Sequence, residues 1–235
     1  MKNQYFGDVG DFGKYALLLA ISKGLSLGIN WYLTPDDASN DGKHIDYKVK
    51  NEFKNCDQDL CDFLSLCITK NKRFVSELTK YSPFQDIPAY EIPLKSPNCR
   101  KSWFEDSLAY LEDCDLLFCD PDNGIKPASI KITYSKSIKY IFACEIKEIL
   151  EQGKSLIVYN HRDRKKHEAY IDRLNTVYDS LNSPNISLRA IRFHRNGTRD
   201  FFIFIQGKHK DIINHNLNKF LETNWNNHFK SLHLN

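Results

Sequence analysis

The sequence has no long hydrophobic run and no evident leader segment. No stretch approaches the roughly 20 apolar residues of a membrane-spanning helix, which argues against a membrane protein or a membrane partner. The first apolar run, YALLLAI, is too short for a signal peptide and follows the charged residues Asp8, Asp11 and Lys14. We therefore expect a cytoplasmic protein.

The seven cysteines include no CxxC pair. Cys56, Cys61 and Cys67 lie five and six residues apart, a spacing that suits helix faces better than zinc ligands. The odd number and the scattered positions favour reduced thiols over a disulfide framework. A structural zinc site is therefore not expected.

A strong charge imbalance is also missing, since 33 basic residues face 30 acidic ones for a net charge of +3. Bulk charge therefore does not indicate nucleic-acid binding, and such a role needs a local basic patch. Basic residues do gather near Lys126, near Arg162 and Arg164, and near Arg195. These four are the predicted contacts to nucleic acid, although solvated helix faces explain the same counts.

The chain does contain a regular alternation of helical and strand patterns. Helices are predicted at 11–23, 48–70, 72–81, 100–113, 140–153, 162–181 and from 210 onward. Strands are predicted at 27–34, 89–94, 115–119 and 155–161, with a hairpin over 186–207 that turns at Asn196-Gly197. This order predicts an α/β fold, a mainly parallel, Rossmann-like three-layer sandwich that ends in an antiparallel hairpin. We expect a single domain over 1–235, with 43–90 as a helical insertion.

Ligands of such sheets bind outside the carboxyl ends of the strands, so the residues after each strand are candidates. The strand DLLFC runs into Asp120-Pro121-Asp122-Asn123-Gly124. Pro121 stiffens the tip, and two acids one residue apart can share a cation or divide acid and base roles. The alternative is a polar turn whose side chains cap their own backbone.

The loop after the strand 27–34, TPDDASNDG, carries Asp36, Asp37 and Asp41 but only one glycine. Carboxylates suit Mg²⁺ or a ribose hydroxyl, and they would repel a phosphate. The alternative is an Asp/Asn-rich surface turn with no ligand.

The strand 155–161 ends in His161 and is followed by Arg162 and Arg164. His161 is a candidate general base or metal ligand, and the arginines are candidate phosphate ligands. The alternative is a surface histidine before a basic helix start. Basic charge there opposes the helix dipole, which favours another reason for the arginines.

The opening segment, NQYFGDVGDFGKYALL, sets Tyr5, Asp11 and Lys14 among three glycines spaced three residues apart. This spacing suggests a backbone held close to a neighbour. The segment lacks the Gly-Lys-Ser/Thr ending of a phosphate-binding loop. The alternative is a flexible terminus that leads into a capped helix.

Four fragments, in this order, resemble class I methyltransferases and most of all the bacterial 23S ribosomal RNA adenine-N6 methyltransferases. GDVGDFGKYALL is similar to the family's leading segment, and WYLTPDD is similar to its first strand. LLFCDPDNG and GKSLIVYNH are similar to its catalytic turn and to its next strand. The QYFGD start and the Asp-Pro-Asp-Asn-Gly turn also resemble a set of uncharacterised bacterial proteins, which implies no activity.

The resemblance implies a methyltransferase-like enzyme that uses S-adenosylmethionine and acts on a nucleic acid or a nucleotide. Asp120 would accept a hydrogen bond from the substrate amine, and Asn123 would orient the base. The predicted catalytic residues are Asp120, Asp122, Asn123, Lys14 and His161, and the predicted cofactor residues are Tyr5, Asp11, Asp36, Asp37 and Asp41. The chain departs from the family where PDDASNDG replaces a glycine-rich loop and Asp122-Asn123 replaces Pro-Tyr.

The abundance of acids supports a second hypothesis, a Mg²⁺- or Mn²⁺-dependent nuclease or phosphodiesterase on the same scaffold. Its predicted metal ligands are Asp36, Asp37, Asp120 and Asp122. Such a site needs three or more oxygen ligands that converge within about 2.0–2.6 Å of the cation. A third hypothesis is a nucleic-acid-binding module that kept the fold without catalysis.

Overall fold

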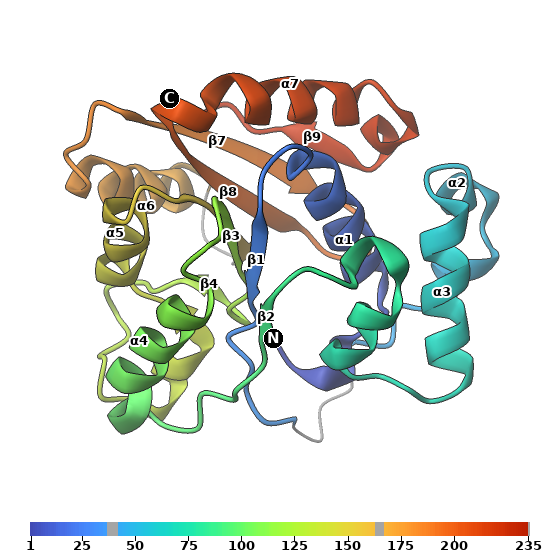
Figure 1. Cartoon of the computed structure of the whole chain (residues 1–235), viewed down its shortest axis with the longest axis horizontal. Helices are drawn as coiled ribbons and strands as arrows, with labels where there is room; N and C mark the ends of the chain where they lie inside the picture. The colour runs from blue at the N-terminus through green and yellow to red at the C-terminus, as the bar shows by residue number, and fades with distance from the viewer. Residues whose placement is uncertain (37–41, 163–166, 235) are drawn as a thin grey trace.

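A seven-stranded sheet forms the centre of the molecule (Figure 1). The computed structural model describes residues 1–36, 42–162 and 167–234. The strands lie in the order β2, β1, β3, β6, β8, β7, β9. Their bounds are Leu27–Asn30 (β1), Ala89–Tyr90 (β2), Leu116–Cys119 (β3), Ser155–His161 (β6), Ile186–Phe193 (β7), Arg199–Gln206 (β8) and Phe229–Ser231 (β9). A separate parallel pair joins β4 (Gly124–Ile125) to β5 (Tyr140–Ile141).

Most strands of this sheet run in one direction. β2, β1, β3 and β6 pair in parallel, whereas β8 is antiparallel to both β6 and β7, and β9 is antiparallel to β7. This confirms the predicted α/β class with a mostly parallel sheet. From β1 the chain moves outward to β2 and then returns to β3 on the other side of β1. The strand order therefore reverses between β1 and β3.

Helices cover both faces of the sheet (Figure 1). The α-helices are Val9–Ile21 (α1), Asn51–Lys54 (α2), Gln58–Thr69 (α3), Arg100–Tyr110 (α4), Ala143–Glu151 (α5), His167–Ser180 (α6) and Lys210–Leu221 (α7). Residues of α1 and α7 share one hydrophobic core with the sheet, and residues of α4, α5 and α6 share a second core with it. The sheet separates these two cores.

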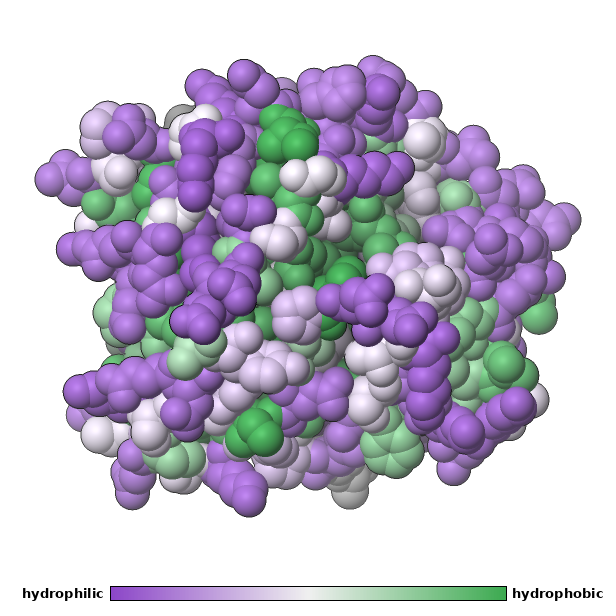
Figure 2. Space-filling model, in the orientation of Figure 1, coloured by the Kyte–Doolittle hydropathy of each residue, from purple (hydrophilic) through white to green (hydrophobic). Residues whose placement is uncertain are grey.

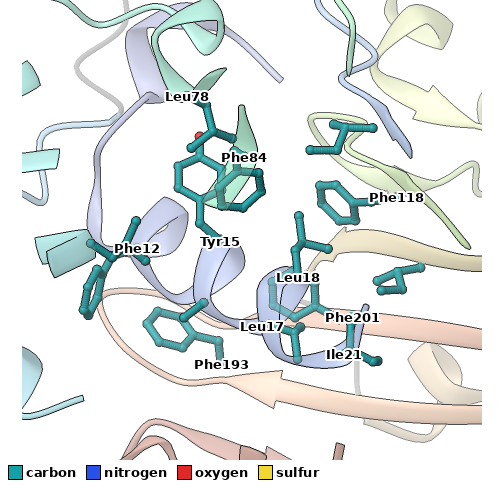
Figure 3. Packing of buried hydrophobic residues seen from close by; sticks show 14 of the residues in the cluster. Phe12, Tyr15, Leu17, Leu18, Ile21, Leu78, Phe84, Phe118, Phe193 and Phe201 are labelled. Atoms are coloured by element: carbon teal, nitrogen blue, oxygen red, sulfur yellow. The ribbon is translucent and has the colours of Figure 1, made fainter. Parts of the chain in front are cut away.

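Strand β3, Leu-Leu-Phe-Cys, is apolar and buried throughout because both faces of the sheet are covered there. Phe118 and Ile157 enter the first core, whereas their neighbours Leu117 and Val158 enter the second. This follows from the period of two along a strand. Figure 3 shows the first core, where side chains of α1 lie among those of β3, β7 and β8.

Helix α1 begins two residues before the predicted start because Asp8 caps it. The Asp8 carboxylate accepts a hydrogen bond from the backbone N–H of Asp11 at 3.0 Å. Ser, Thr, Asp and Asn side chains stabilise helix starts in this way. The cap sets the rotation of α1 and therefore decides which of its side chains face the carboxyl ends of the strands.

The segment 43–90 contains α2, α3 and several short 3-10 helices, and its apolar residues join the core around α1. Residues 72–81, predicted to be α-helical, instead form the 3-10 helix Val75–Lys80. Asn71 has a positive φ of 55°, and Pro83 follows closely. The left-handed backbone at Asn71 and the fixed φ of Pro83 bound this segment on both sides, and the prediction of an α-helix was wrong.

The predicted hairpin and closing helix are present as β7–β8 and α7. Asn196 and Gly197 have φ values of 47° and 107°, as a hairpin turn requires. The sheet does not end at the hairpin, however, because β9 follows α7 and pairs with β7. Phe229 packs this short strand against β7, with its ring centroid 4.9 Å from that of Phe193.

Hydrophilic residues cover most of the molecular face shown in Figure 2. Across residues 1–36, 42–162 and 167–234, no helix has the length and apolar character needed to span a bilayer. All seven cysteines are unpaired, as the sequence predicted, and Cys61, Cys67, Cys114 and Cys119 are buried.

Candidate active site

A cavity of about 300 Å³ lies at the carboxyl ends of β3 and β6, beside the first turns of α1. Its lining residues are Met1, Tyr5, Asp8, Gly10, Asp11, Lys14, Gly42, His44, Asp120, Asp122, Asn123, Tyr159, His161, Asn196 and Arg199. Its volume is at the lower end of the range for small-molecule sites. The cavity therefore occupies the edge where a sheet with this strand order binds its ligands.

Lys14 lies between two carboxylates at the base of this cavity. Its ammonium is 2.6 Å from Asp11 Oδ1 and 2.6 Å from Asp120 Oδ2, and its side chain is 3% exposed. Asp11 and Lys14 share a helix face because they are three residues apart. Asp120 continues β3 two residues beyond Phe118, so its side chain points toward α1. Tyr15 Oη donates a further hydrogen bond to Asp11 Oδ2 at 2.9 Å.

This cluster changes the acidity of its members. Burial alone would lower the pKa of Lys14, but the carboxylates of Asp11 and Asp120 raise that pKa above its ordinary value. Lys14 is therefore an ammonium at neutral pH and cannot act as a base. Burial raises the pKa of Asp120, and Lys14 opposes part of that increase. Asp120 is thus a desolvated hydrogen-bond acceptor with one oxygen held by Lys14.

Asp122 lies next to the ammonium group of Met1. Asp122 Oδ1 is 2.8 Å from the Met1 nitrogen, and the same ammonium donates to the carbonyls of Tyr32 at 3.2 Å and Asp120 at 2.7 Å. Thr34 Oγ1 donates to Asp122 Oδ2 at 3.2 Å. Burial opposes ionisation of Asp122, yet the Met1 ammonium together with Lys139 and Lys2 outweighs it and lowers the pKa of this carboxyl. Acceptors that follow β1 and β3 in the chain therefore bind one ammonium group together.

Arg199 of β8 closes another side of the cavity. Its Nη2 lies 3.3 Å from Asp8 Oδ2, and its Nη1 donates to the carbonyl of Arg195 at 2.9 Å. Gly10 makes room for it, because a Cβ at that position would lie 2.3 Å from Arg199 Nε. Burial raises the pKa of Asp8, and Arg199 opposes this increase. The three glycines noted in the sequence are thus close to side chains of the protein itself: Gly7 to Ile68, Gly10 to Arg199 and Gly13 to Phe193.

Asn160 of β6 fixes the position of the Asp-Pro-Asp-Asn-Gly turn. Asn160 Oδ1 accepts a hydrogen bond from the N–H of Ile125 at 2.8 Å, and its Nδ2 donates to Tyr170 Oη at 2.8 Å. Gly124 has a φ of 91°, and a Cβ there would lie 2.0 Å from Asn160 Oδ1. Only glycine fits this position, so the turn has a fixed place relative to β6.

Seven of the predicted site residues line this one cavity. They are Tyr5, Asp11, Lys14, Asp120, Asp122, Asn123 and His161. Asp36 does not line it; its side chain is exposed and accepts a hydrogen bond from the N–H of Gln4 at 3.1 Å. Asp37 and Asp41 lie outside the described residues, so their predicted contact with the cofactor or metal stays a prediction.

Of the predicted nucleic-acid residues, the three that the structure describes make separate contacts. Lys126 Nζ donates to the carbonyls of Pro127 and Ile130 in its own loop. Arg195 Nε donates to His228 Nδ1 at 2.7 Å, beside the C-terminal segment. Arg162 lies over the ring of Tyr170 at the end of β6. Arg164 falls outside the described residues.

The predicted metal ligands are separated by positive charges. Lys14 holds Asp120, and the Met1 ammonium holds Asp122. In the part of the chain that the structure describes, no group of three or more His, Cys, Asp or Glu side chains is placed to bind a metal ion. Asp37, the fourth predicted ligand, lies outside that part.

Several cavity residues were not singled out from the sequence: Met1, Asp8, His44, Tyr159, Asn196 and Arg199. Tyr159 had a usable signal, because it lies two residues before His161 on one strand and so shares its face. Asp8 had another, as an Asp just before an apolar helical run. Arg199 gave only a general signal, as one of several basic residues around the hairpin, because its place in the cavity depends on how the hairpin packs on α1.

No protein-family model matches the chain, and no curated protein shows significant similarity to it.

Proposed function

We propose that the protein is an S-adenosylmethionine-dependent methyltransferase that modifies an exocyclic amine of a base in a nucleic acid or nucleotide. The observation that carries this proposal is the Asp120 carboxylate. It is buried, it lines the cavity at the end of β3, and Lys14 fixes one of its oxygens. A desolvated, immobile acceptor is the group that an amine nucleophile needs for orientation.

The fold supports the same proposal. We regard the sheet as Rossmann-like because its strand order reverses between β1 and β3, and the cavity lies beside this reversal, at the carboxyl ends of β3 and β6. Open α/β sheets bind their ligands at this edge. The resemblance of the leading segment and of the Asp-Pro-Asp-Asn turn to the adenine-N6 methyltransferases falls on residues that meet in this cavity. The unpaired cysteines fit a reducing compartment, and we propose the cytoplasm.

The cavity has groups that fit S-adenosylmethionine. The cofactor carries a methionyl ammonium, and the carbonyls of Tyr32 and Asp120 with Asp122 Oδ1 already hold an ammonium, that of Met1. We propose that the cofactor would use these acceptors in place of Met1. Arg199 would complement the cofactor carboxylate. When bound, the cofactor would supply a methyl group on a positively charged sulfur.

The chain's own side chains would orient the nucleophile. Asp120 would accept one hydrogen of the substrate amine, which turns the nitrogen lone pair toward the methyl group. Asn123 would contact the edge of the base, and Lys14 would keep Asp120 from rotating. The amine gains a methyl group and loses one proton, and the carboxylate of Asp120 provides the path by which that proton leaves.

The metal-dependent hypothesis is less well supported by this geometry. Asp120 is paired with the Lys14 ammonium at 2.6 Å, so a cation would first have to displace Lys14. Like charges at that distance repel strongly in a buried site. The binding-module hypothesis predicts ligand affinity without turnover, and the experiment below separates it from catalysis.

The test begins with thermal unfolding in the presence of S-adenosylhomocysteine, S-adenosylmethionine, Mg²⁺ or Mn²⁺. A ligand at 100 times its Kd stabilises the fold by about 2.7 kcal/mol, or roughly 5–10 °C for a chain of this size. We expect the adenosyl compounds to give this shift. Transfer of a labelled methyl group to RNA, DNA and nucleotides then shows whether binding leads to catalysis. A shift with Mn²⁺ alone would replace the proposal with the metal-dependent one.

A further inference from the structure

Strand β2 forms one edge of the central sheet, next to β1 (Figure 1). Ala89 lies opposite Ile29 and Tyr90 lies opposite Asn30, which is the one pairing that β2 makes among the described residues. An edge strand presents backbone groups that can receive a further strand. The segment 85–92, which contains β2 and leads into and out of it, is called the β2 edge below.

The direction of the backbone groups along the β2 edge follows from its bonds to the β1 side. The carbonyls of Pro88 and Tyr90 accept hydrogen bonds from that side at 2.9 and 3.4 Å. In a trans peptide the C=O and the following N–H point in opposite directions, so the N–H groups of Ala89 and Glu91 point away from the sheet. In the part of the chain that the structure describes, no group accepts a hydrogen bond from either of them.

A groove of about 630 Å³ lies beside these donors. It is lined by the β2 edge, by Ser76 and Thr79, and by Tyr110 at the end of α4. Ile92 and Tyr110 are 58% and 57% exposed, so the groove contains apolar surface that water now covers. It shares no described residue with the candidate active site.

The groove also carries negative charge without a matching cation. Asp86 and Glu91 line it, and none of the described lining residues is a lysine, an arginine or a histidine. Glu91 is half-buried, and among the described residues its carboxylate has neither a hydrogen-bond donor nor an ion-pair partner. Burial raises the pKa of Glu91. A cation supplied by a ligand would stabilise the ionised carboxylate.

This charge argues against a second copy of the chain as the occupant. Two identical edges that pair about a two-fold axis place the same residues in one small interface. The carboxylates of Asp86 and Glu91 would then lie near their own copies, and like charges on adjacent strands are destabilising. An occupant that brings basic side chains is the better match.

We propose that the β2 edge binds an extended segment of a partner protein in which apolar and basic side chains alternate. The segment would add a strand to the sheet and accept hydrogen bonds from the N–H groups of Ala89 and Glu91. A lysine or arginine of the segment would pair with Glu91, and apolar side chains would cover Ile92 and Tyr110. This inference does not depend on the proposed function, because the groove and the cavity are separate.

The test measures binding of fluorescein-labelled decapeptides by anisotropy, without cofactor. A decapeptide of alternating lysine and valine is the probe. A lysine–proline decapeptide has the same charge but lacks half of the backbone donors and cannot form a regular strand, and a glutamate–valine decapeptide has the opposite charge. We expect the lysine–valine peptide to bind at least about 10-fold more tightly than either of the others.

Two variants change the edge in different ways. Ala89→Pro removes an N–H that points away from β1, and proline is tolerated at such positions of an edge strand. Glu91→Gln keeps the size of the side chain and removes its charge. We expect each variant to bind the lysine–valine peptide roughly 3- to 10-fold more weakly. Binding to Glu91→Gln should also depend less on salt. Thermal unfolding reports whether each variant folds, and Glu91→Gln tests the inference by itself if Ala89→Pro does not.

Glu222→Gln, which changes an exposed carboxylate at the end of α7, is the matched control and should bind as the wild type does. The inference is overturned if the wild type does not bind the lysine–valine peptide, or binds the lysine–proline peptide equally well. Equal affinity of the wild type, Ala89→Pro and Glu91→Gln would also overturn it. A wild-type dimer in sedimentation that dissociates in Ala89→Pro would instead assign the edge to a second copy of the chain.

Discussion

Lys14 connects the two acids on which the candidate site depends. It is 2.6 Å from both Asp11 and Asp120 and lies 5.5 Å from the ring centroids of Tyr15 and Trp31. A buried ammonium without partners would be costly, and here two carboxylates and two aromatic rings offset that cost. Lys14 is therefore a positioning residue for Asp120 and does not exchange protons itself.

Changing Asp120 should separate catalysis from stability. Asp120→Asn keeps the shape of the side chain, and Lys14 keeps its contact with Asp11. We expect methyl transfer to fall by at least about 100-fold while S-adenosylhomocysteine binding is retained. Labelled-methyl assays and thermal shifts measure the two effects. Asp115→Asn, at the other end of β3, is the control, and an unchanged transfer rate in Asp120→Asn would remove Asp120 from the mechanism.

Replacing Asp120 by alanine should destabilise the fold as well as remove the candidate acceptor. Asp120 is 2% exposed and shares Lys14 with Asp11, so alanine would leave a cavity and a weakened buried ion pair. Breaking such a pair usually costs several kcal/mol. For this reason the asparagine variant is the better probe of the site.

At the scale of elements, the candidate catalytic turn depends on its contact with β6. Gly124 and Asn160 touch so closely that a side chain at 124 would displace either the turn or the strand. The N–H of Ile125 would then lose its acceptor in a buried place. The geometry of Asp120 and Asn123 therefore depends on a residue that lines no part of the cavity.

A pair of glycine variants tests this dependence. Gly124 and Gly153 both have positive φ, 91° and 75°, but a Cβ at 153 would meet nothing nearer than Lys208 Nζ at 3.8 Å. Gly153→Ala should therefore cost only backbone strain, about 1 kcal/mol, whereas Gly124→Ala should cost about 2–4 kcal/mol. Urea unfolding measures both. Equal losses would mean that the contact with Asn160 does not hold the turn.

Elements with strong local signals could be predicted from the sequence. The strand 155–161 matches β6 at both ends, and Asn196-Gly197 located the hairpin turn correctly. Strand β9 could not be predicted, because FKS has one apolar residue and forms only where the edge of β7 receives it. Its formation is a tertiary effect, and β propensity reflects such context more than local preference.

The cavity residues that follow a strand, or that lie near the capped start of α1, could be predicted from the sequence. Asp120 and His161 line one cavity because the parallel strands β3 and β6 present their carboxyl ends at one edge, and Lys14 lines it from α1. Arg199 and the Met1 ammonium could not be anticipated, since no spacing within the chain relates β8 to Asp8 or residue 1 to Asp122. Their positions follow from packing between segments that are distant in the sequence.

At the scale of the whole molecule, three wholly or partly buried histidines make the free energy of unfolding depend on pH. Burial is the main cause that lowers the pKa values of His194, His209 and His228 below the ordinary 6.5. His228 is 0% exposed, and its Nδ1 accepts a hydrogen bond from Arg195, which requires a neutral ring. The unfolded chain therefore binds more protons than the folded one just below pH 6.5.

Stability should consequently fall as the pH is lowered through 6.5 toward the folded-state pKa values. His228→Gln keeps an acceptor for Arg195 but cannot be protonated. We expect the loss of unfolding free energy between about pH 7.5 and 5.5 to be smaller in this variant than in the wild type. Urea unfolding at both pH values measures the difference. An identical loss in both proteins would show that His228 is not one of the coupled groups.

The length of β6 limits how this chain can evolve. A one-residue insertion or deletion between Ser155 and Asn160 would reverse the face of every later side chain in that strand. Asn160 would then point into the cavity, and the Asp-Pro-Asp-Asn-Gly turn would lose its support. Related chains should therefore tolerate substitutions at many of these positions while keeping the number of residues in this strand constant.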